Sequence, residues 1–307
     1  MTGRGELSDG QWERLEPLLP VSNGRCGRWR DHRQVINGIL HRIRTGVPWR
    51  DLPERFGPWK TAYERHRLWS ADGTWERLFQ QILAAADAEG GIDWDISVDS
   101  TVMRAHQDAA GARRTPLPAP GSTKGAPGPE RQDERRWLSP LARLAAGAAG
   151  EGLGRSRGGF STKLHLSADG SCRPLSLVVT PGQRADCTQF EPVMEKIRVP
   201  RTGPGRPRRR PDSVSADKAY SSRTIRAYLR RRGIRHVIPE KKDHKNARLR
   251  RGSRGGRPPG FDRERHKKRN TVERAINKLK GFRAVAGRYD KRDYVFLGTV
   301  TVASLVI

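Results

Sequence analysis

The sequence predicts an α/β domain at 91–307 preceded by a small all-α domain at 1–90. Between residue 8 and about residue 90, apolar side chains recur at helical spacing in four short segments. From about residue 92 the order of elements is strand, β-hairpin, helix, strand, helix, strand. Because strands and helices that alternate along a chain usually pack as layers of one unit, this order favours an α/β domain over separate all-α and all-β units.

Capping residues mark the starts of the first two helices. Ser8 stands three residues before Gln11, and Asp31 stands three residues before Gln34, which is the spacing of a capping box. In the second segment, VINGILHRI, the aliphatic side chains fall on one helical face, and Gly46 follows where a C-cap glycine belongs. Both segments are therefore predicted to be amphipathic helices with defined ends.

The third and fourth helices are predicted to start at Thr61 and Asp72. The third, TAYERHRLW, carries a basic cluster that resembles the reading helix of a helix-turn-helix. On this interpretation Arg65 and Arg67 contact DNA. The alternative is a basic surface helix without that role, because many helical domains have one.

Two strands of the second region lead into an aspartate. IDWDISVDS is predicted to be a strand that leads into Asp99, and DSVSADKAY a short strand that ends at Asp217. Between them, STKLHLSADGSCRPLSLVVT is predicted to be a β-hairpin and DCTQFEPVMEKI a helix. A helix closed by Gly233 and the strand RHVIP follow.

Two segments interrupt this order. Residues 108–157 are rich in Ala, Gly, Pro and Arg, and are predicted to be a long irregular insertion. Residues 240–268 are strongly basic, rich in Gly and poor in strand signals. Both could be flexible solvated linkers, but the charge of the second favours an insertion that lies along a phosphate backbone.

The charge of the chain indicates its class of partner. Lys and Arg number 61 against 33 Asp and Glu, which gives a formal net charge of +28. Such a surface attracts polyanions, so we expect nucleic acid as the partner. Charge alone leaves open a non-catalytic basic protein of the ribosomal or chromatin type.

The sequence also predicts a cytoplasmic protein that has no membrane partner. The three cysteines are far apart and form no CxxC pair, which argues against a zinc ribbon and a disulfide framework and fits a reducing compartment. The first residues lack the apolar core of a signal peptide. No window approaches the ~18 consecutive apolar residues of a membrane span.

Asp99 and Asp217 are the first two candidate site residues. Taken singly, each could be an ordinary turn or N-cap residue at the end of a strand. Carboxylates at the C-terminal ends of neighbouring strands, however, meet where α/β folds place their ligands. The repetition therefore favours a shared site.

Glu273, in RHKKRNTVERAINKLKGF, is the third candidate. At about 100° per residue of helix, three basic side chains project within roughly 40° of it: His266, Arg269 and Lys280. The adjacent apolar stripe, which would pack on the sheet, consists of Val272, Ile276 and Leu279. The alternative is a solvated helix face with ordinary i,i+4 charge pairs.

Two Asp and one Glu suit one task well. Hard oxygen ligands select Mg²⁺ or Mn²⁺. Two such ions close together can clamp the attacking and leaving oxygens of an in-line phosphoryl displacement. A strongly basic chain with these three ligands is therefore a candidate for phosphodiester chemistry on nucleic acid.

Four motifs in order, VDSTVMRAH, GGFSTKLHL, ADKAYSS and RNTVERAINKLKGFRAVAGRYDKR, resemble the DDE transposases of bacterial insertion sequences, of the insertion-sequence-five family. Residues 7–53 are similar to the helical domain that precedes the catalytic core in that family. The likeness covers nearly the whole chain. It implies a ribonuclease H-like catalytic core, in which helices flank a mixed sheet, and metal-dependent cutting and joining of transposon ends.

The resemblance also assigns roles to residues. The family's two Asp and its Glu are matched by Asp99, Asp217 and Glu273. These would be the catalytic residues, and together they would bind two ions of Mg²⁺ or Mn²⁺. Arg269 and Lys280 stand at the family's spacing from the Glu and would contact DNA. His266 stands where a Tyr is usual, and a His can still contact a phosphate.

The function that follows is a transposase that binds terminal inverted repeats and catalyses DNA strand cleavage and strand transfer. Its partners would be the double-stranded DNA of transposon ends and target, which it would bind as a homodimer, with no small-molecule substrate. It would lie with the nucleoid in the bacterial cytoplasm. Two alternatives stay open: a ribonuclease H-like nuclease that cuts without joining, and a decayed transposase that acts as a DNA-binding repressor.

Overall fold

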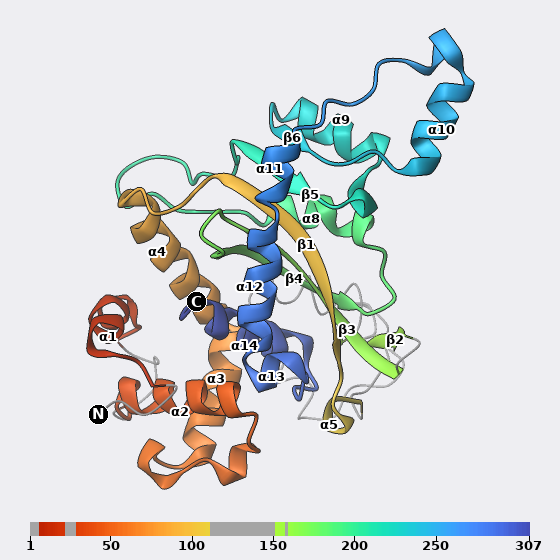
Figure 1. The fold of residues 1–307 in the computed structure, drawn as a ribbon. Helices are drawn as coiled ribbons and strands as arrows, with labels where there is room; N and C mark the ends of the chain where they lie inside the picture. Colours follow the sequence, from red (N-terminus) through yellow and green to blue (C-terminus); the bar gives the residue numbers. More distant parts are fainter. Residues whose placement is uncertain (1–5, 22–28, 111–150, 157–158) are drawn as a thin grey trace, which may run out of the picture.

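The computed structural model describes residues 6–21, 29–110, 151–156 and 159–307. It shows a mixed β-sheet with helices on both faces and a group of N-terminal helices against one end (Figure 1). This arrangement confirms the predicted fold class. No helix in the described ranges is both long and apolar enough to cross a membrane.

The described part of the N-terminal region contains four α-helices: α1 (Asp9–Leu15), α2 (His32–Thr45), α3 (Trp59–Ala71) and α4 (Thr74–Ala88). The capping residues act as predicted for the first two. The Ser8 hydroxyl accepts from the Gln11 amide while the Gln11 side chain accepts from the Ser8 amide, and Asp31 accepts from the amide of Gln34. Gly46 ends α2 at φ 73°, a backbone conformation that favours glycine.

Helix α3 differs from its prediction because it begins at Trp59 rather than at Thr61. The carbonyl of Pro58 accepts the first helical hydrogen bond from the Thr61 amide at 2.9 Å, and no side chain caps this end. Proline fixes its own φ and needs no donor, so it opens the helix ahead of Thr61. Three 3₁₀ turns complete the region, Glu16–Leu18, Trp49–Asp51 and Glu54–Phe56.

Within the residues that the structure describes, the sheet has six strands: β1 (Asp95–Arg104), β2 (Gly154–Ser156), β3 (Gly159–Ala168), β4 (Pro174–Pro181), β5 (Ser213–Ala216) and β6 (Arg235–Val237). β3 lies antiparallel to β1, β2 and β4, which confirms the predicted hairpin. β5 lies parallel to β1 on its other side, and β6 lies parallel to β5 at the edge. Parallel strands joined through helices are the α/β element expected of a ribonuclease H-like core.

Strand β1 continues well past Asp99, whereas the sequence predicted Asp99 near its end. Its antiparallel pairing with β3 runs on to Arg104, opposite Ser161. Its parallel pairing with β5 stops at Val98, opposite Ala216. Asp99 is thus a mid-strand residue that lies where the parallel neighbour ends.

Helices cover the two faces of the sheet. One face packs on α8 (Phe190–Glu195) and α9 (Arg223–Arg231), with the 3₁₀ turns Asp186–Gln189 (η4) and Lys218–Tyr220 (η5) nearby. The other face packs on α12 (Asn270–Lys280), which is followed by α13 (Arg283–Ala286) and α14 (Asp293–Ser304). The predicted apolar stripe is buried, as Val272 and Leu279 are fully inaccessible and Ile276 is 7% exposed.

The N-terminal helices share a hydrophobic core with the C-terminal helices. One cluster of buried side chains joins residues of α2, α3 and α4 to residues of α12, α13 and α14. Inside it, Arg42 of α2 lies 3.5 Å from Asp290, each with a 5% exposed side chain. Asp290 also accepts from Thr299 at 2.8 Å, and Thr299 contacts His66 of α3 at 3.1 Å. The regions 1–90 and 91–307 therefore do not have separate cores.

The two predicted insertions differ in what the structure describes. Most of 108–157 lies outside the described residues, but its two ends belong to the fold, in α5 (Gln107–Ala110) and β2. Within 240–268 the chain is helical rather than a featureless linker, with α10 (Lys242–Arg250), the turn Gly252–Gly255 and α11 (Arg263–Lys267). Figure 1 shows α10 set apart from the sheet.

Burial of His66 makes the stability of the fold depend on pH. Burial lowers the pKa of His66 to about 4, against about 6.5 in an unfolded chain. The unfolded state therefore binds this proton first as the pH falls, so stability is present above pH 6.5 and is lost between pH 6.5 and 4. The loss is on the order of 3 kcal/mol.

Replacement His66→Gln should remove that part of the pH dependence, measured as the free energy of unfolding in urea at several pH values. The control is His244→Gln, at an exposed position of α10. An unchanged slope between pH 6.5 and 4 in His66→Gln would contradict the assignment.

Candidate active site

Strand register brings Asp99 and Asp217 side by side. Ser97 of β1 lies opposite Ser215 of β5, and the next pair, Val98 and Ala216, is the last of the ladder. One step further in the same register are Asp99 and Asp217. Because side chains alternate along a strand, both carboxylates share the face of the two serines, which is opposite the buried Val98 and Ala216.

Glu273 comes to the same face from helix α12. Arg269, the residue that precedes this helix, links it to β1: one guanidinium nitrogen lies 3.0 Å from Asp99 Oδ2, and the other donates to Glu273 Oε1. The buried stripe of α12 fixes the height and rotation of Glu273 over the sheet. Arg269 thus links Asp99 to Glu273, and Asp217 and Glu273 both lie near enough to Asp99 for their charges to act on its carboxyl.

The four residues expected on one helix face lie on two helices instead. His266 belongs to α11, and the chain turns at Lys268 and Arg269 before α12 begins. Between these helices the amide hydrogen bonds span three residues rather than four, as from Arg269 to His266. This tighter winding advances each residue by about 120°, so a count at 100° does not hold across the break.

His266 nevertheless lies at the site. Burial is the largest cause that lowers the pKa of its imidazole, and Arg269 lowers it further, while Asp217 and the carbonyl of Ala216 act in the opposite direction. Its Nε2 is buried and has no partner among the described residues. Lys280, in contrast, is exposed at the last residue of α12, about 10 Å along the axis from Glu273.

Arg65 is not on the surface, which corrects its prediction as a DNA contact. It is 8% exposed, its guanidinium stacks 4.0 Å from the centre of the Trp29 ring, and Nη1 lies 3.0 Å from His32 Nδ1. Aromatic rings attract this cation and compensate part of its burial. Arg67, two residues on, is half-buried.

Negative charge is concentrated at Asp99. Burial raises the pKa of its carboxyl, the Ser100 amide and Arg269 lower it, and the negative charges of Asp217 and Glu273 raise it again. Like charges at close range repel, so this trio is stabilised by any cation placed among them. In the structure that cation is Arg269.

The sequence matches the models of two known protein families. Residues 91–306 match the family described as "Transposase DDE domain". The chain belongs to this family of DDE transposases. The helical region matches separately, at residues 7–79, the family described as "Putative transposase of IS4/5 family".

Relatives of this transposase are known from several bacteria. The "Uncharacterized protein y4sN" of Sinorhizobium fredii is 38% identical over 35% of this chain and 83% of its own. The "Putative transposase for insertion sequence element IS402" of Burkholderia cepacia is 34% identical over 36% of this chain and 48% of its own length. The "Putative transposase for insertion sequence element IS6501" of Brucella ovis is 28% identical over 48% of this chain and 98% of its own length.

A solved structure, "Mos1 transposase paired-end complex with left transposon end", also aligns with 91% of this transposase and 78% of that chain. The TM-score is 0.24 and the identity 11%, a level of likeness that transfers neither fold nor function. Family membership favours a transposase over the nuclease and repressor alternatives.

The carboxylates of the transposase suit the divalent metal on which this family depends. They offer hard oxygen ligands, and their mutual repulsion is relieved by a cation. Among the described residues no three acidic, His or Cys side chains yet converge as a metal-binding group. Arg269 contacts both Asp99 and Glu273 in this structure.

Sequence reasoning missed a group of residues on the opposite face of β1. The Ser100 hydroxyl donates to Asp186 at 2.7 Å, and Lys163 of β3 donates to the same oxygen at 2.9 Å. Burial works against ionisation here, but these two hydrogen bonds hold the pKa of Asp186 below its usual value. The sequence held one signal for this group, which was a lysine inside a buried strand. Asp186 itself lies in a turn that has no recognisable motif. The group fixes β1 at the residue next to Asp99.

Removal of this carboxylate should disturb both stability and activity. Asp186→Ala removes the acceptor of Ser100 and the charged partner of Lys163, which keeps only the carbonyl of Arg184. The loss should cost about 1–3 kcal/mol in urea unfolding and slow DNA end cleavage. The matched control is Asp212→Ala, an exposed carboxylate paired with Arg208, which should cost at most about 1 kcal/mol. Equal effects of the two substitutions would contradict the role of Asp186.

Proposed function

We propose that this transposase cleaves and joins DNA strands with Asp99, Asp217 and Glu273 as its catalytic, metal-binding residues. The observation that carries the proposal is the register of β1 and β5, which sets two carboxylates side by side just beyond the last strand pair. Glu273 joins them because Arg269 contacts both Glu273 and Asp99. The function rests on carboxylates, so no Ser or Tyr nucleophile is required.

Mg²⁺ and Mn²⁺ both suit these ligands, and the site would hold two such ions. Bound ions of this kind supply activation of water and stabilisation of the charge on the phosphate oxygens. The chain's own part is to hold three carboxylates on rigid elements. Two of them stand on a central sheet, and the third stands on a helix whose apolar side is fully packed.

The basic residues around the site would bind the DNA backbone. Arg269 neutralises two carboxylates in the structure, and it would turn to a DNA phosphate when metal takes over that charge. His266, with an unpartnered and buried Nε2, would contact a phosphate on the Asp217 side. Lys280 would contact the backbone further along, because it is exposed at the end of α12.

Other parts of the chain would hold the rest of the DNA. The helical region would bind terminal inverted repeats, without Arg65 but with exposed cations such as Arg44 and Arg50 on the surface of α2 and the turn after it. The basic segment 240–268 would grip the duplex backbone. Because transposition brings two ends together, the active form would be a homodimer on DNA in the bacterial cytoplasm.

Loss of one ligand charge tests the catalytic assignment. Asp99→Asn should abolish metal-dependent cleavage and joining of a transposon-end duplex, because the amide no longer supplies an anionic ligand. Binding of the same duplex should stay nearly intact. The control is Asp108→Asn, at an exposed carboxylate of α5. Full strand transfer by Asp99→Asn would contradict the proposal, and a donor end with a free 3′-hydroxyl shows whether the wild type joins or only cuts.

Salt dependence tests the role of Lys280. Lys280→Ala should weaken DNA binding and reduce the slope of log K against log salt by about 0.9, the value for one duplex phosphate contact. Lys278→Ala provides a matched control, because Lys278 is also exposed on α12 but points about 200° away around the helix. Slopes that fall equally in both variants would argue against a specific contact.

A further inference from the structure

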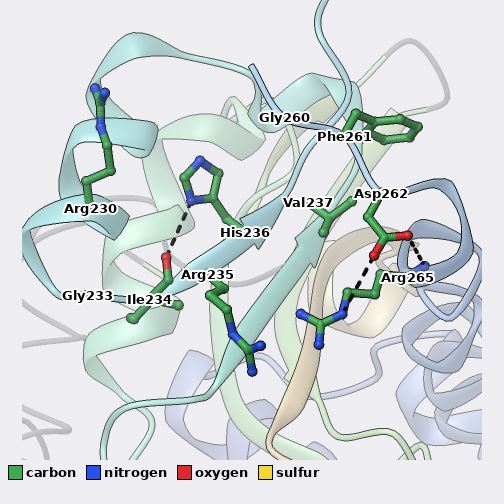
Figure 2. Close-up of a pocket in the computed structure, with 10 residues that line it drawn as sticks. All are labelled: Arg230, Gly233, Ile234, Arg235, His236, Val237, Gly260, Phe261, Asp262 and Arg265. Atoms are coloured by element: carbon green, nitrogen blue, oxygen red, sulfur yellow. Dashed lines mark hydrogen bonds and ion pairs between the residues drawn. The ribbon is translucent and has the colours of Figure 1, made fainter. Parts of the chain in front are cut away.

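A basic groove runs along strand β6, at the edge of the sheet. It has a volume of about 870 Å³. β6 forms its floor, and its other lining residues come from the end of α9 and from 260–265. Figure 2 shows Arg230 of α9 on one side and Phe261, Asp262 and Arg265 on the other. The proposed function gives no individual role to these residues, although 260–265 belong to the basic segment 240–268.

The arginines of the groove differ in whether they already have an acidic partner. Arg265 is engaged, since it lies 3.8 Å from Asp95 and 3.9 Å from Asp262. Arg230 and Arg235 are exposed, and neither forms an ion pair with a described carboxylate. Arg235 only donates to the carbonyl of Asp212, at 3.3 Å. The groove therefore offers two guanidinium groups that an anion could bind.

An exposed aromatic ring stands at the same groove. Phe261 is 48% exposed, so part of its ring surface is open to solvent. Its ring centre lies 5.1 Å from that of His266, and His266 in turn is held against Ala216 and next to Asp217. Phe261 thus stands between the groove and the candidate active site.

Phosphate-binding arginines beside a free aromatic face are the features that bind single-stranded nucleic acid. A duplex presents phosphates as well, but its base faces are covered by their neighbours, so the Phe261 ring would go unused. A second copy of this chain, at +28, would be repelled by the arginines.

We propose that the β6 groove holds one unpaired DNA strand next to the active site, with its phosphates on Arg230 and Arg235 and one base stacked on Phe261. This inference rests on the proposed function, because a strand-cutting enzyme produces or exposes such a strand. It adds a specific site for that strand, outside the carboxylate cluster.

The experiment measures binding of a fluorescent oligothymidylate of about 12 nucleotides to the full chain, without divalent metal, over a series of salt concentrations. Phe261→Ala should weaken binding about 5- to 150-fold, the range for loss of one base–aromatic stack, and Phe261→Trp should restore it. Arg230→Ala and Arg235→Ala should each lower the salt slope by about 0.7, the value for a single-strand phosphate.

Two matched variants act as controls. Arg231→Ala removes the same charge from the neighbouring position of α9, which does not line the groove. Leu249→Ala removes a 59% exposed apolar side chain from α10. Both should bind the oligonucleotide like the wild type, apart from a small uniform electrostatic loss for Arg231→Ala.

Three outcomes would overturn the inference: unchanged binding by Phe261→Ala, equal losses for Arg231→Ala and Arg235→Ala, or an equal loss with a duplex of the same length. Joining of a donor end by the wild type is measured separately in Mg²⁺. A wild type that does not join but binds through the groove refutes the proposed function alone. Normal joining with groove-independent binding refutes the groove alone.

Discussion

The parallel pairing of β1 with β5 is the constraint on which the rest of the site depends. It stops at Val98 and Ala216, and the next residue of each strand is an aspartate on the same face. Antiparallel pairing with β3 continues beyond this point and keeps β1 in the sheet where β5 has ended. Asp99 is therefore held by one neighbour and left open to a ligand on the side of the other.

Charge balance explains the residues gathered around that point. Three carboxylates on one face repel each other, and Arg269 offsets this by contacting Asp99 and Glu273 together. On the opposite face, Lys163 and Ser100 satisfy Asp186 and anchor the next residue of β1. Arg269 and Lys163 thus offset negative charge on the two faces of β1, and exposed cations such as Lys280 are available to contact DNA.

Much of this was predictable from local patterns, and the rest depended on long-range contacts. Ser8, Asp31 and Gly46 mark helix ends because capping is a matter of a few neighbouring residues. The full length of β1 was not predictable, since pairing with β3 is decided by residues more than fifty positions away. The break before α12 and the burial of Arg65 were missed for the same reason, because neither a change of helix winding nor a tryptophan partner is written in the local sequence.

The shared core ties the helical region to the catalytic fold, so DNA held by one is held at a fixed position relative to the other. We propose that Asp99 and Asp217 share a metal ion because strand register places them next to each other. The most direct test is the anomalous scattering of Mn²⁺ in crystals of the chain bound to a transposon-end duplex. We expect manganese ligated by both Asp99 and Asp217. Manganese bound by other residues, with these two carboxylates apart, would contradict it.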